Sequence, residues 1–414
     1  MIQTSYKEML VTIIQSLDLI NAILKNHHRR TAVISYHLGR AFGLNQADLK
    51  LLVMAASVHD LGALSVIERD QLMILDVENP EPHAILGSAM LEGLPFFDDI
   101  SVVVRHHHLK WREASSLDLR IANICSILHL SDRIDILSDH QKHLKHQFES
   151  IMTQVQNHEN KIFSPEAIEA FKLCGETEFF WLDVEHMTMQ ALLDRVLDGS
   201  YDIVMDYHLL NDFSNTLAKV IDYRSPFTAT HSQGVSAVAY AIAQYMKFDK
   251  ETCEKLKIAG LLHDIGKIGI TNEIINKNGS LTDDEFEEMK THTYYTYLIL
   301  SGIKSLNQIA TWASSHHEKQ DGTGYPFKLS HHEVGIEATV LAYADVFTAL
   351  SEIRPYRAGL PLEEVLFKLK DIFVSCEYPR VYDVISKHAT SLNQVREKAQ
   401  EMPHFHYEKV MAGK

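Results

Sequence analysis

The chain has 414 residues, a length that favours two domains over one. Its 55 acidic and 39 basic side chains leave a net charge of −16, so we expect no broad basic face that binds bulk nucleic acid. The 46% hydrophobic content is typical of a globular protein and excludes a disordered chain.

The four cysteines lie far apart in the sequence and include no CxxC pair. We therefore expect neither a disulfide framework nor a thiolate zinc site. No run of about eighteen uncharged apolar residues is present, and the first residues lack the pattern of a secretory signal. These features predict a cytoplasmic protein that does not enter a membrane.

Apolar residues recur at helical spacing along most of the chain, whereas alternating strand patterns are scarce, so we expect an all-α protein. The polar stretch at residues 198–200 predicts a boundary between a domain over residues 1–200 and a second over residues 201–414. A hydroxyl followed by three acidic residues at 282–285 is typical of a helix start. Further helices are expected over residues 207–221, 234–246, 251–262 and 362–374.

Two stretches of the chain repeat the same histidine spacing without a gap. In both stretches the first and second histidines are 32 residues apart, and the third and fourth are 24 residues apart. A fifth histidine directly follows the fourth. The first copy supplies His27, His59, Asp60, His83, His107, His108 and Asp132, and the second supplies His231, His263, Asp264, His292, His316, His317 and Asp345. A repeat of roughly 150 to 200 residues is too long for a solenoid and implies two copies of one domain.

The second-copy set contains only imidazoles and carboxylates, which suit Fe, Mn, Ni or Zn in a mixed nitrogen and oxygen site. Six or seven candidate ligands exceed the four of a structural zinc site. The side chains of His263 and Asp264 diverge by about 100° on a helix, so the carboxylate can bridge to a second ion. The set predicts a two-metal site, although any one of these histidines alone could be an ordinary surface or core residue.

The segments HDIGKIGI, HHEKQDGTGYP and LAYADVFTALSEIRPYR resemble the HD-GYP family, a branch of the HD-domain metal-dependent phosphohydrolases. The resemblance covers roughly residues 222 to 380, and its HHEKQDGTGYP string is highly specific. It implies two tandem HD-type helical domains, the second of HD-GYP type, with a two- or three-metal centre. It also implies hydrolysis of a cyclic dinucleotide, above all cyclic di-GMP, to linear pGpG and further to GMP by a metal-activated hydroxide.

The resemblance assigns the seven second-copy residues as metal ligands, with Asp264 as the bridging carboxylate. Lys267 stands at the family's lysine position, where it would neutralise the charge of the phosphorane or protonate the leaving oxygen. The alternative interpretation is that Lys267 is an ordinary solvent-exposed lysine at a helix end. If the helix continues from His263, Lys267 faces the same side. Arg354 and Arg357 match positions that grip substrate phosphate, as bidentate guanidinium groups do. The loop expected to shape the substrate entrance and to carry partner contacts comprises Asp321, Gly322, Gly324, Tyr325 and Pro326.

One departure concerns the number of metal ions. Family members with three metals carry a Glu where this chain has Phe227, and a phenyl ring cannot ligate. We therefore expect two divalent ions, Fe or Mn with Ni or Zn as alternatives. A water molecule or the carboxylate of Asp222 would be needed to complete a third position.

The first copy keeps its ligand set but departs from the family elsewhere. Ala63 occupies the position of Lys267, and HHLKWREASS stands in place of HHEKQDGTGYP. We expect a degenerate HD domain that binds metal and serves regulation or dimerisation. The alternatives are a second active phosphohydrolase and a scaffold whose histidines no longer hold metal.

The intact lysine, ligands and loop of the second copy favour a cyclic-dinucleotide phosphodiesterase. The alternative substrate is 3′3′-cyclic GMP-AMP, since the choice between guanine and adenine depends on a few pocket contacts that no motif reveals. The alternative to an enzyme is a protein that binds a cyclic dinucleotide or a partner without catalysis, as a receptor or interaction protein does. The expected partners are the cyclic dinucleotide, a second copy of the chain in a homodimer, and proteins that contact the loop.

Overall fold

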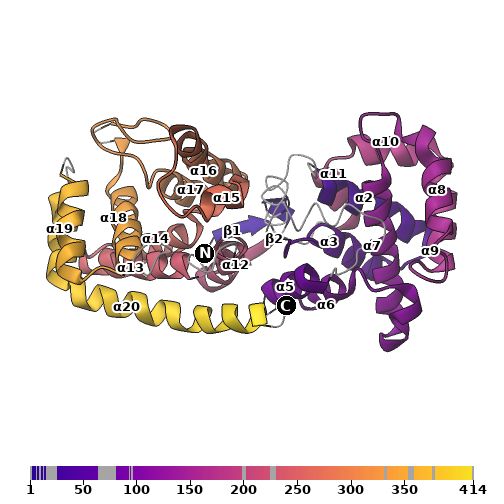
Figure 1. Ribbon diagram of the computed structural model, residues 1–414, viewed down its shortest axis with the longest axis horizontal. Coiled ribbons are helices and arrows are strands. Elements are labelled where there is room, and N and C mark those ends of the chain that lie inside the picture. Colours follow the sequence, from indigo (N-terminus) through magenta and orange to yellow (C-terminus); the bar gives the residue numbers. More distant parts are fainter. Residues whose placement is uncertain are drawn as a thin grey trace. The chain divides into compact units, whose positions relative to one another are not determined.

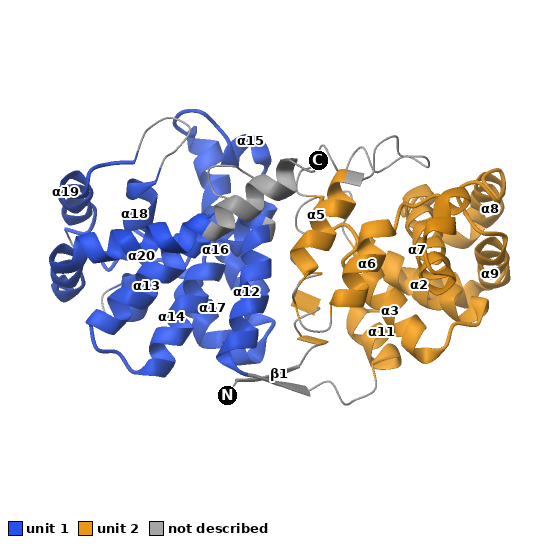
Figure 2. Cartoon of the chain, turned by 90° about the horizontal axis from the view of Figure 1, so that it is seen from below, with its two compact units in different colours: residues 1–4, 204–412 blue, residues 5–203, 413–414 orange. Residues whose placement is uncertain are grey.

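The computed structural model describes residues 2–5, 7–8, 11–12, 14, 26–63, 81–92, 94, 97–197, 202–223, 230–330, 333–352, 359–374 and 378–412. The chain divides into two compact units, which are coloured separately in Figure 2. The N-terminal unit comprises Ser5–Ile203 with Gly413–Lys414, and the C-terminal unit comprises Met1–Thr4 with Val204–Ala412.

The N-terminal unit is a bundle of helices around α7, which is buried along most of its length. Helix α2 packs against α3, α7 and α9, and α5 packs against α6. The elements in chain order are α2 (His27–Phe42), α3 (Gln46–Ala56), α5 (Glu81–Leu91), α6 (Asp98–His106), η1 (Trp111–Ser116), α7 (Leu119–Leu137), η2 (Leu144–Gln147), α8 (Phe148–Gln156), α9 (Pro165–Gly175), α10 (Glu178–His186) and α11 (Met189–Val196). Because α7 is buried along most of its length and contacts α2, α3, α6, α8 and α9, it forms the centre of this unit's core.

The C-terminal unit is built around α13, which packs against α14, α18 and the long helix α20 (Figure 1). Its elements are α12 (Tyr207–Asp222), α13 (His231–Tyr245), α14 (Lys250–Leu262), η3 (Ile265–Gly269), α15 (Asn272–Ile275), α16 (Asp283–Ser301), η4 (Lys304–Leu306), α17 (Asn307–Ser314), α18 (Ile336–Ser351), α19 (Leu362–Ile372) and α20 (Pro379–Ala412). Strands β1 (Ile2–Ser5) and β2 (Asp202–Met205) form a two-stranded sheet. The all-α expectation is confirmed apart from this small sheet. No helix in the described ranges is both long and apolar enough to cross a membrane.

The expected helices over residues 207–221, 234–246, 251–262 and 362–374 correspond to α12, α13, α14 and α19 with small shifts of their ends. Thr282 caps α16, and Glu285 completes a capping box, as the local sequence predicts. The helical continuation from His263 that would have placed Lys267 on the same face does not occur. Helix α14 ends at Leu262, and a separate 3₁₀ turn, η3, follows.

A close backbone contact explains why the chain turns after each HD doublet. A Cβ atom at Gly266 would lie 1.9 Å from the carbonyl oxygen of His292 on α16, and one at Gly62 would lie 2.1 Å from that of His83 on α5. Only glycine allows the two backbones to approach this closely. The turn therefore brings each HD doublet against the helix that carries the next histidine of the repeat.

Candidate metal centre

The C-terminal unit brings the seven second-copy residues together from five separate segments. His231 is the first residue of α13, the HD doublet follows α14, and His292 lies in α16. The histidine pair at 316–317 follows α17, and Asp345 lies in α18. All seven belong to groups whose ligand atoms lie within 4.8 Å of one another, namely His231–His263–Asp264, His263–His316–Asp345 and His292–His316–His317.

The two carboxylate oxygens of Asp264 face different histidines. Oδ2 lies 3.3 Å from Nε2 of His263, and Oδ1 lies 3.6 Å from Nε2 of His292. Nε2 of His231 lies 3.1 Å from Oδ1 of Asp345. Ligands that share one tetrahedral ion at 2.0–2.1 Å lie roughly 3.4 Å from one another, so these spacings fit metal coordination. The position of Asp264 fits a carboxylate that bridges two ions.

Several candidate ligand atoms in this cluster are buried and have no hydrogen-bond partner among the described residues, which is unusual for polar atoms in a protein interior. They are Nε2 of His263, His292 and His316 and Oδ1 of Asp264. The opposite ring nitrogen of each of these histidines donates to a backbone carbonyl three residues earlier, at 2.6–2.9 Å. These hydrogen bonds leave Nε2 free to act as a ligand atom in each ring. The residues present therefore fit a divalent metal centre.

The protonation states also suit metal binding. Burial lowers the pKa of His292 to about 3 and that of His317 to about 4, so both rings are neutral near pH 7. Burial alone would raise the pKa of Asp264, but the charges of His263 and Lys267 hold it well below its usual range. Burial would lower the pKa of His263, but the charges of Asp264 and Asp345 raise it. Metal binding at this ring therefore displaces a proton, whereas His292 and His317 already have the neutral form that a divalent ion requires.

His231 is oriented by residues that the sequence analysis missed. Its Nδ1 donates to Oε2 of Glu352 at 3.0 Å, which leaves Nε2 to face the centre. Gln400 on α20 donates to the other oxygen of Glu352 and, at 3.1 Å, to the carbonyl oxygen of Thr230. Arg396 donates to the amide oxygen of Gln400 at 2.6 Å. No motif marks these residues, and the one available signal is that Glu352 lies two helical turns after Asp345.

Lys267 lies at the edge of the cluster, with 23% of its side chain exposed. Its Nζ donates to Oδ2 of Asp264 at 2.5 Å, so it reaches the expected bridging carboxylate. The lysine therefore lies beside the centre as expected, although it does so from a 3₁₀ turn.

The loop after His317 folds back on the start of its own segment. Both oxygens of buried Glu318 accept backbone N–H groups, from Phe327 at 2.6 Å and from Leu329 at 3.0 Å, a role that the sequence analysis did not foresee. A Cβ atom at Gly324 would lie 2.3 Å from the backbone nitrogen of Lys319, so only glycine fits there. The Tyr325 ring lies 5.0 Å from that of His317. These contacts fix the loop directly against His317.

Other loop residues occupy the turn itself. Gly322 has a positive φ of 75°, and the carboxylate of Asp321 accepts hydrogen bonds from the N–H and hydroxyl of Thr323 at 2.9 and 2.6 Å. Pro326 follows Tyr325 in the same turn. Asp321 thus holds the turn together in this structure.

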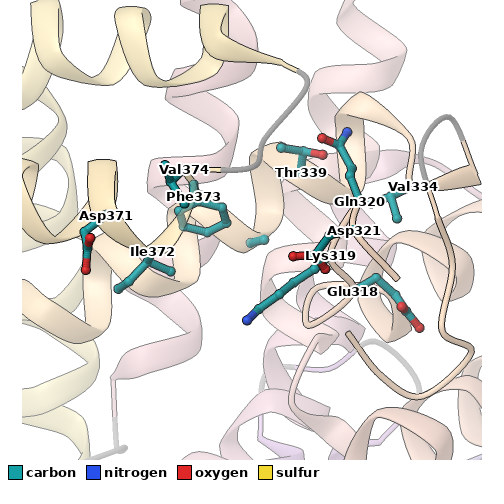
Figure 3. A pocket seen from close by; sticks show the side chains of 11 residues that line it. Glu318, Lys319, Gln320, Asp321, Val334, Thr339, Asp371, Ile372, Phe373 and Val374 are labelled. Atoms are coloured by element: carbon teal, nitrogen blue, oxygen red, sulfur yellow. The ribbon is translucent and has the colours of Figure 1, made fainter. Parts of the chain in front are cut away.

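A cavity of about 400 Å³ opens beside this loop. Figure 3 shows residues 318–321 on one side of it and residues 371–374, at the end of α19, on the other. Phe373 and Val374 give it apolar walls, while Lys319 and Asp321 supply charged groups. This combination is typical of small-molecule sites.

The N-terminal unit brings the seven first-copy residues together in the same way. Two groups meet the same distance criterion, namely Asp60–His83–His107–His108 and His27–His59–Asp132. Burial would lower the pKa of His27, but hydrogen bonds to Asp132 and to a further carboxylate, Asp135, raise it to about 10. Asp135 accepts from Nδ1 of His27 at 2.7 Å and is paired with Arg30 at 2.6 Å. Neither Asp135 nor Arg30 was identified from the sequence.

Phe227 and the two arginines expected to bind phosphate, Arg354 and Arg357, lie outside the described residues. Asp222, considered as a ligand for a third ion, accepts hydrogen bonds from the N–H and hydroxyl of Ser232 at 3.2 and 2.9 Å. Within the described part of the chain it belongs to none of the ligand groups. Burial raises its pKa to about 7.

Comparison with known proteins places both units in one family. Two family profiles, each described as HD domain, match residues 24–162 and residues 215–372. The 3′3′-cGAMP-specific phosphodiesterase 1 of Vibrio cholerae serotype O1 is 25% identical over 92% of this chain and 91% of its own length. The 3′3′-cGAMP-specific phosphodiesterase 3 of that organism is 28% identical over 63% of this chain and 56% of its length.

A cyclic di-GMP phosphodiesterase of Thermotoga maritima is 36% identical over 51% of this chain and 58% of its own length. The crystal structure of a cyclic GMP-AMP specific phosphodiesterase from V. cholerae superimposes with a TM-score of 0.64 over 94% of this chain and 98% of that chain, at 20% identity. At that identity the likeness shows a shared fold. The chain therefore belongs to the HD-domain family and contains two HD domains, the second of which carries the HHEKQDGTGYP string of the HD-GYP branch.

Proposed function

We propose that the protein is a metal-dependent phosphodiesterase that hydrolyses a cyclic dinucleotide in its C-terminal unit. The observation that carries the proposal is the position of Asp264, whose two oxygens face different histidines beside Lys267. The names of the relatives, which are cyclic di-GMP and 3′3′-cGAMP phosphodiesterases, support the substrate class.

The ligand set supports two divalent ions, Fe or Mn, with Ni or Zn as alternatives, because imidazole and carboxylate ligands suit all four. When bound, such ions polarise the phosphoryl oxygens and lower the pKa of a water molecule. The histidines contribute neutral Nε2 atoms, and Asp264 and Asp345 contribute the negative charge. His231 is kept in place by Glu352, so that its Nε2 stays aimed at the centre.

Lys267 is the group proposed to complete the reaction. Its ammonium lies next to Asp264 and is partly exposed, so an arriving phosphate can approach its Nζ. There it holds a proton for the leaving 3′ oxygen and adds positive charge beside the phosphoryl group. We further propose that Arg354 and Arg357 bind substrate phosphate and that the loop from Asp321 to Pro326 shapes the entrance.

We take cyclic di-GMP, cleaved to linear pGpG, as the substrate and 3′3′-cyclic GMP-AMP as the second candidate. The second is favoured by a relative named for that activity, which is matched over 92% of this chain. A receptor that binds without turnover is disfavoured by the presence of Lys267 beside the ligand cluster. We propose regulation or dimerisation as the role of the N-terminal unit, with a homodimer and proteins that contact the loop as partners.

The test uses the full chain reconstituted anaerobically with Mn²⁺ or Fe²⁺ and supplied with each cyclic dinucleotide. We expect a linear dinucleotide product, and we expect Asp264→Ala to lose both turnover and C-terminal metal. Asp284→Ala, which removes an exposed carboxylate of the same unit, is the matched control and should behave as wild type. Full turnover in Asp264→Ala would refute the proposed centre. Metal-loaded protein that binds a cyclic dinucleotide but leaves it uncut would identify a receptor.

A further inference from the structure

The cavity beside the loop is a candidate site that the proposed reaction does not use. Its volume of about 400 Å³ is typical of a pocket for a small molecule. Among the described residues, neither Lys267 nor any of the seven second-copy ligands lines it. The cavity lies between residues 318–321, which follow the histidine pair, and residues 371–374, at the end of α19 (Figure 3). It is therefore distinct from the candidate metal centre.

One wall of the cavity is apolar. Phe373 and Val374 form it together with Ile372. The Phe373 ring stacks on that of buried Tyr343, with the centroids 3.8 Å and the planes 18° apart, so α18 fixes its position. Ile372 is 47% exposed and Val374 is 80% exposed, so much of this wall is in contact with water. A ligand with an apolar body would cover it, and removal of apolar surface from water favours binding.

The opposite wall carries one positive and one negative side chain. Lys319 and Asp321 extend from this wall toward Phe373 in Figure 3. Hydrogen bonds from Thr323 lower the pKa of Asp321, and the nearby charge of Lys319 adds to the shift. The ammonium and the carboxylate are thus close enough to interact, but they form no ion pair with each other. A ligand that lies between them can contact both.

The Asp321 carboxylate is held in place through one of its oxygens. The N–H and the hydroxyl of Thr323 both donate to Oδ1, at 2.9 and 2.6 Å, which leaves Oδ2 for a ligand. The nearby carboxylate of Glu318 already accepts two backbone N–H groups. Asp371 lies on the far side of Phe373 from Asp321 in Figure 3. The charged wall therefore offers a ligand one carboxylate oxygen and one ammonium group.

We propose that this cavity binds a zwitterion with an apolar body, of the class of α-amino acids with a large apolar side chain. The ammonium of the ligand donates to Oδ2 of Asp321, and its carboxylate accepts from Lys319. Its side chain lies against Phe373 and Val374. A cyclic dinucleotide does not suit this cavity, because it would bring a phosphate next to Asp321 and supplies no cation to pair with that carboxylate. Binding here is independent of the proposed hydrolysis and stands if that activity is absent.

Occupancy of the cavity also stabilises the loop after His317. Glu318, which lines the cavity, holds the returning strand of the loop through two backbone N–H groups. A ligand that joins residues 318–321 to the end of α19 restrains the start of this loop, since binding to one conformation stabilises it. The Tyr325 ring of the same loop lies 5.0 Å from that of His317. Ligand binding is therefore a regulatory input to the centre, a role that rests on the proposed function.

Isothermal titration calorimetry of the full chain, without a cyclic dinucleotide, tests the site with three probes that share one apolar body. L-Phenylalanine carries both charges, phenethylamine carries only the ammonium, and 3-phenylpropionate carries only the carboxylate. We expect saturable binding of one L-phenylalanine per chain and binding of the other two that is about tenfold weaker. Absence of L-phenylalanine binding, or equally tight binding of either single-charge probe, would overturn the proposal.

Substitutions assign the binding to this cavity. Lys319→Gln and Asp321→Asn should each weaken L-phenylalanine binding about tenfold, and the asparagine keeps an oxygen that accepts from Thr323. Val374→Asp places a negative charge on the apolar wall at an exposed position, so it should weaken binding while the chain stays folded. Lys370→Gln removes an exposed lysine of α19 outside the cavity and is the matched control. Unchanged binding in both Lys319→Gln and Asp321→Asn would overturn the proposal.

Limited proteolysis with chymotrypsin measures the effect on the loop. Saturating L-phenylalanine should slow cleavage within residues 321–330 severalfold in the wild type, and this protection should be lost in Lys319→Gln. An unchanged cleavage rate with L-phenylalanine bound would overturn the coupling between cavity and loop. Neither this measurement nor the calorimetry requires turnover, so failure of the proposed hydrolysis is recognised separately.

Discussion

Replacing Glu352 tests how the tertiary structure supports His231, a proposed metal ligand. Glu352 is 8% exposed and accepts the Nδ1–H of His231 at 3.0 Å. Glu352→Ala would leave that N–H buried without an acceptor, at a cost of about 1–3 kcal/mol. Loss of the carboxylate that orients a ligating histidine typically weakens metal binding about 10–100-fold, or about 1.4–2.8 kcal/mol. The two magnitudes agree, so we expect a loss of metal affinity in that range.

Competition of the full chain with a chelator at a series of Mn²⁺ concentrations measures this loss, and the hydrolysis rate is followed in parallel. Glu352→Gln keeps an oxygen that can accept the hydrogen bond but removes the charge, so its loss should be smaller than that of Glu352→Ala. Gln400→Leu should have a smaller effect than Glu352→Ala, because it removes a donor that holds Glu352 but keeps the Glu352 carboxylate. Glu364→Gln, at an exposed glutamate of α19, is the matched control. Wild-type metal affinity in Glu352→Ala would show that His231 needs no orienting partner.

The remaining predictions concern residues around the same unit. Lys267→Ala should lower kcat about 10²- to 10⁴-fold with metal content intact, and metal lost along with activity would contradict a proton-donor role. Glu318→Ala should free the backbone of the loop and raise KM, and faster proteolysis of the loop is an independent readout. An unchanged rate of proteolysis would show that Glu318 does not hold the loop in place. Because burial raises the pKa of Asp222 to about 7, its ionisation costs stability as pH rises through that value. Asp222→Asn should therefore resist urea better than wild type at about pH 8, by a margin that shrinks toward about pH 5, and a margin independent of pH would refute that shifted pKa.

The proposed ligand positions could be picked out from the sequence because they repeat. The intervals of 32 and 24 residues recur in both halves of the chain, and packing alone does not require histidines at those places. Both sets do converge in the structure, and the HD doublets lie where glycines at 62 and 266 permit close backbone contact. Metal coordination restricts ligands to a few residue types, so the signal survives in the sequence.

Whether the helix of the HD doublet continues to Lys267 could not be decided from the sequence, because helical spacing extends past the real helix end. A local pattern cannot show that the backbone near Gly266 approaches the carbonyl of His292 so closely that the chain must turn. The lysine still reaches Asp264, since a 3₁₀ turn places residues three apart on one side.

The sequence by itself determined the helical fold class, the duplication and the residue types that could hold metal. Tertiary structure alone decided which partners orient and neutralise those residues. His27 is held by Asp135, three residues after Asp132, whereas His231 is held by Glu352, seven residues after Asp345, with help from α20. An orienting hydrogen bond can come from any side chain that packs within reach. Its source therefore follows from how the helices pack and has no fixed spacing in the chain.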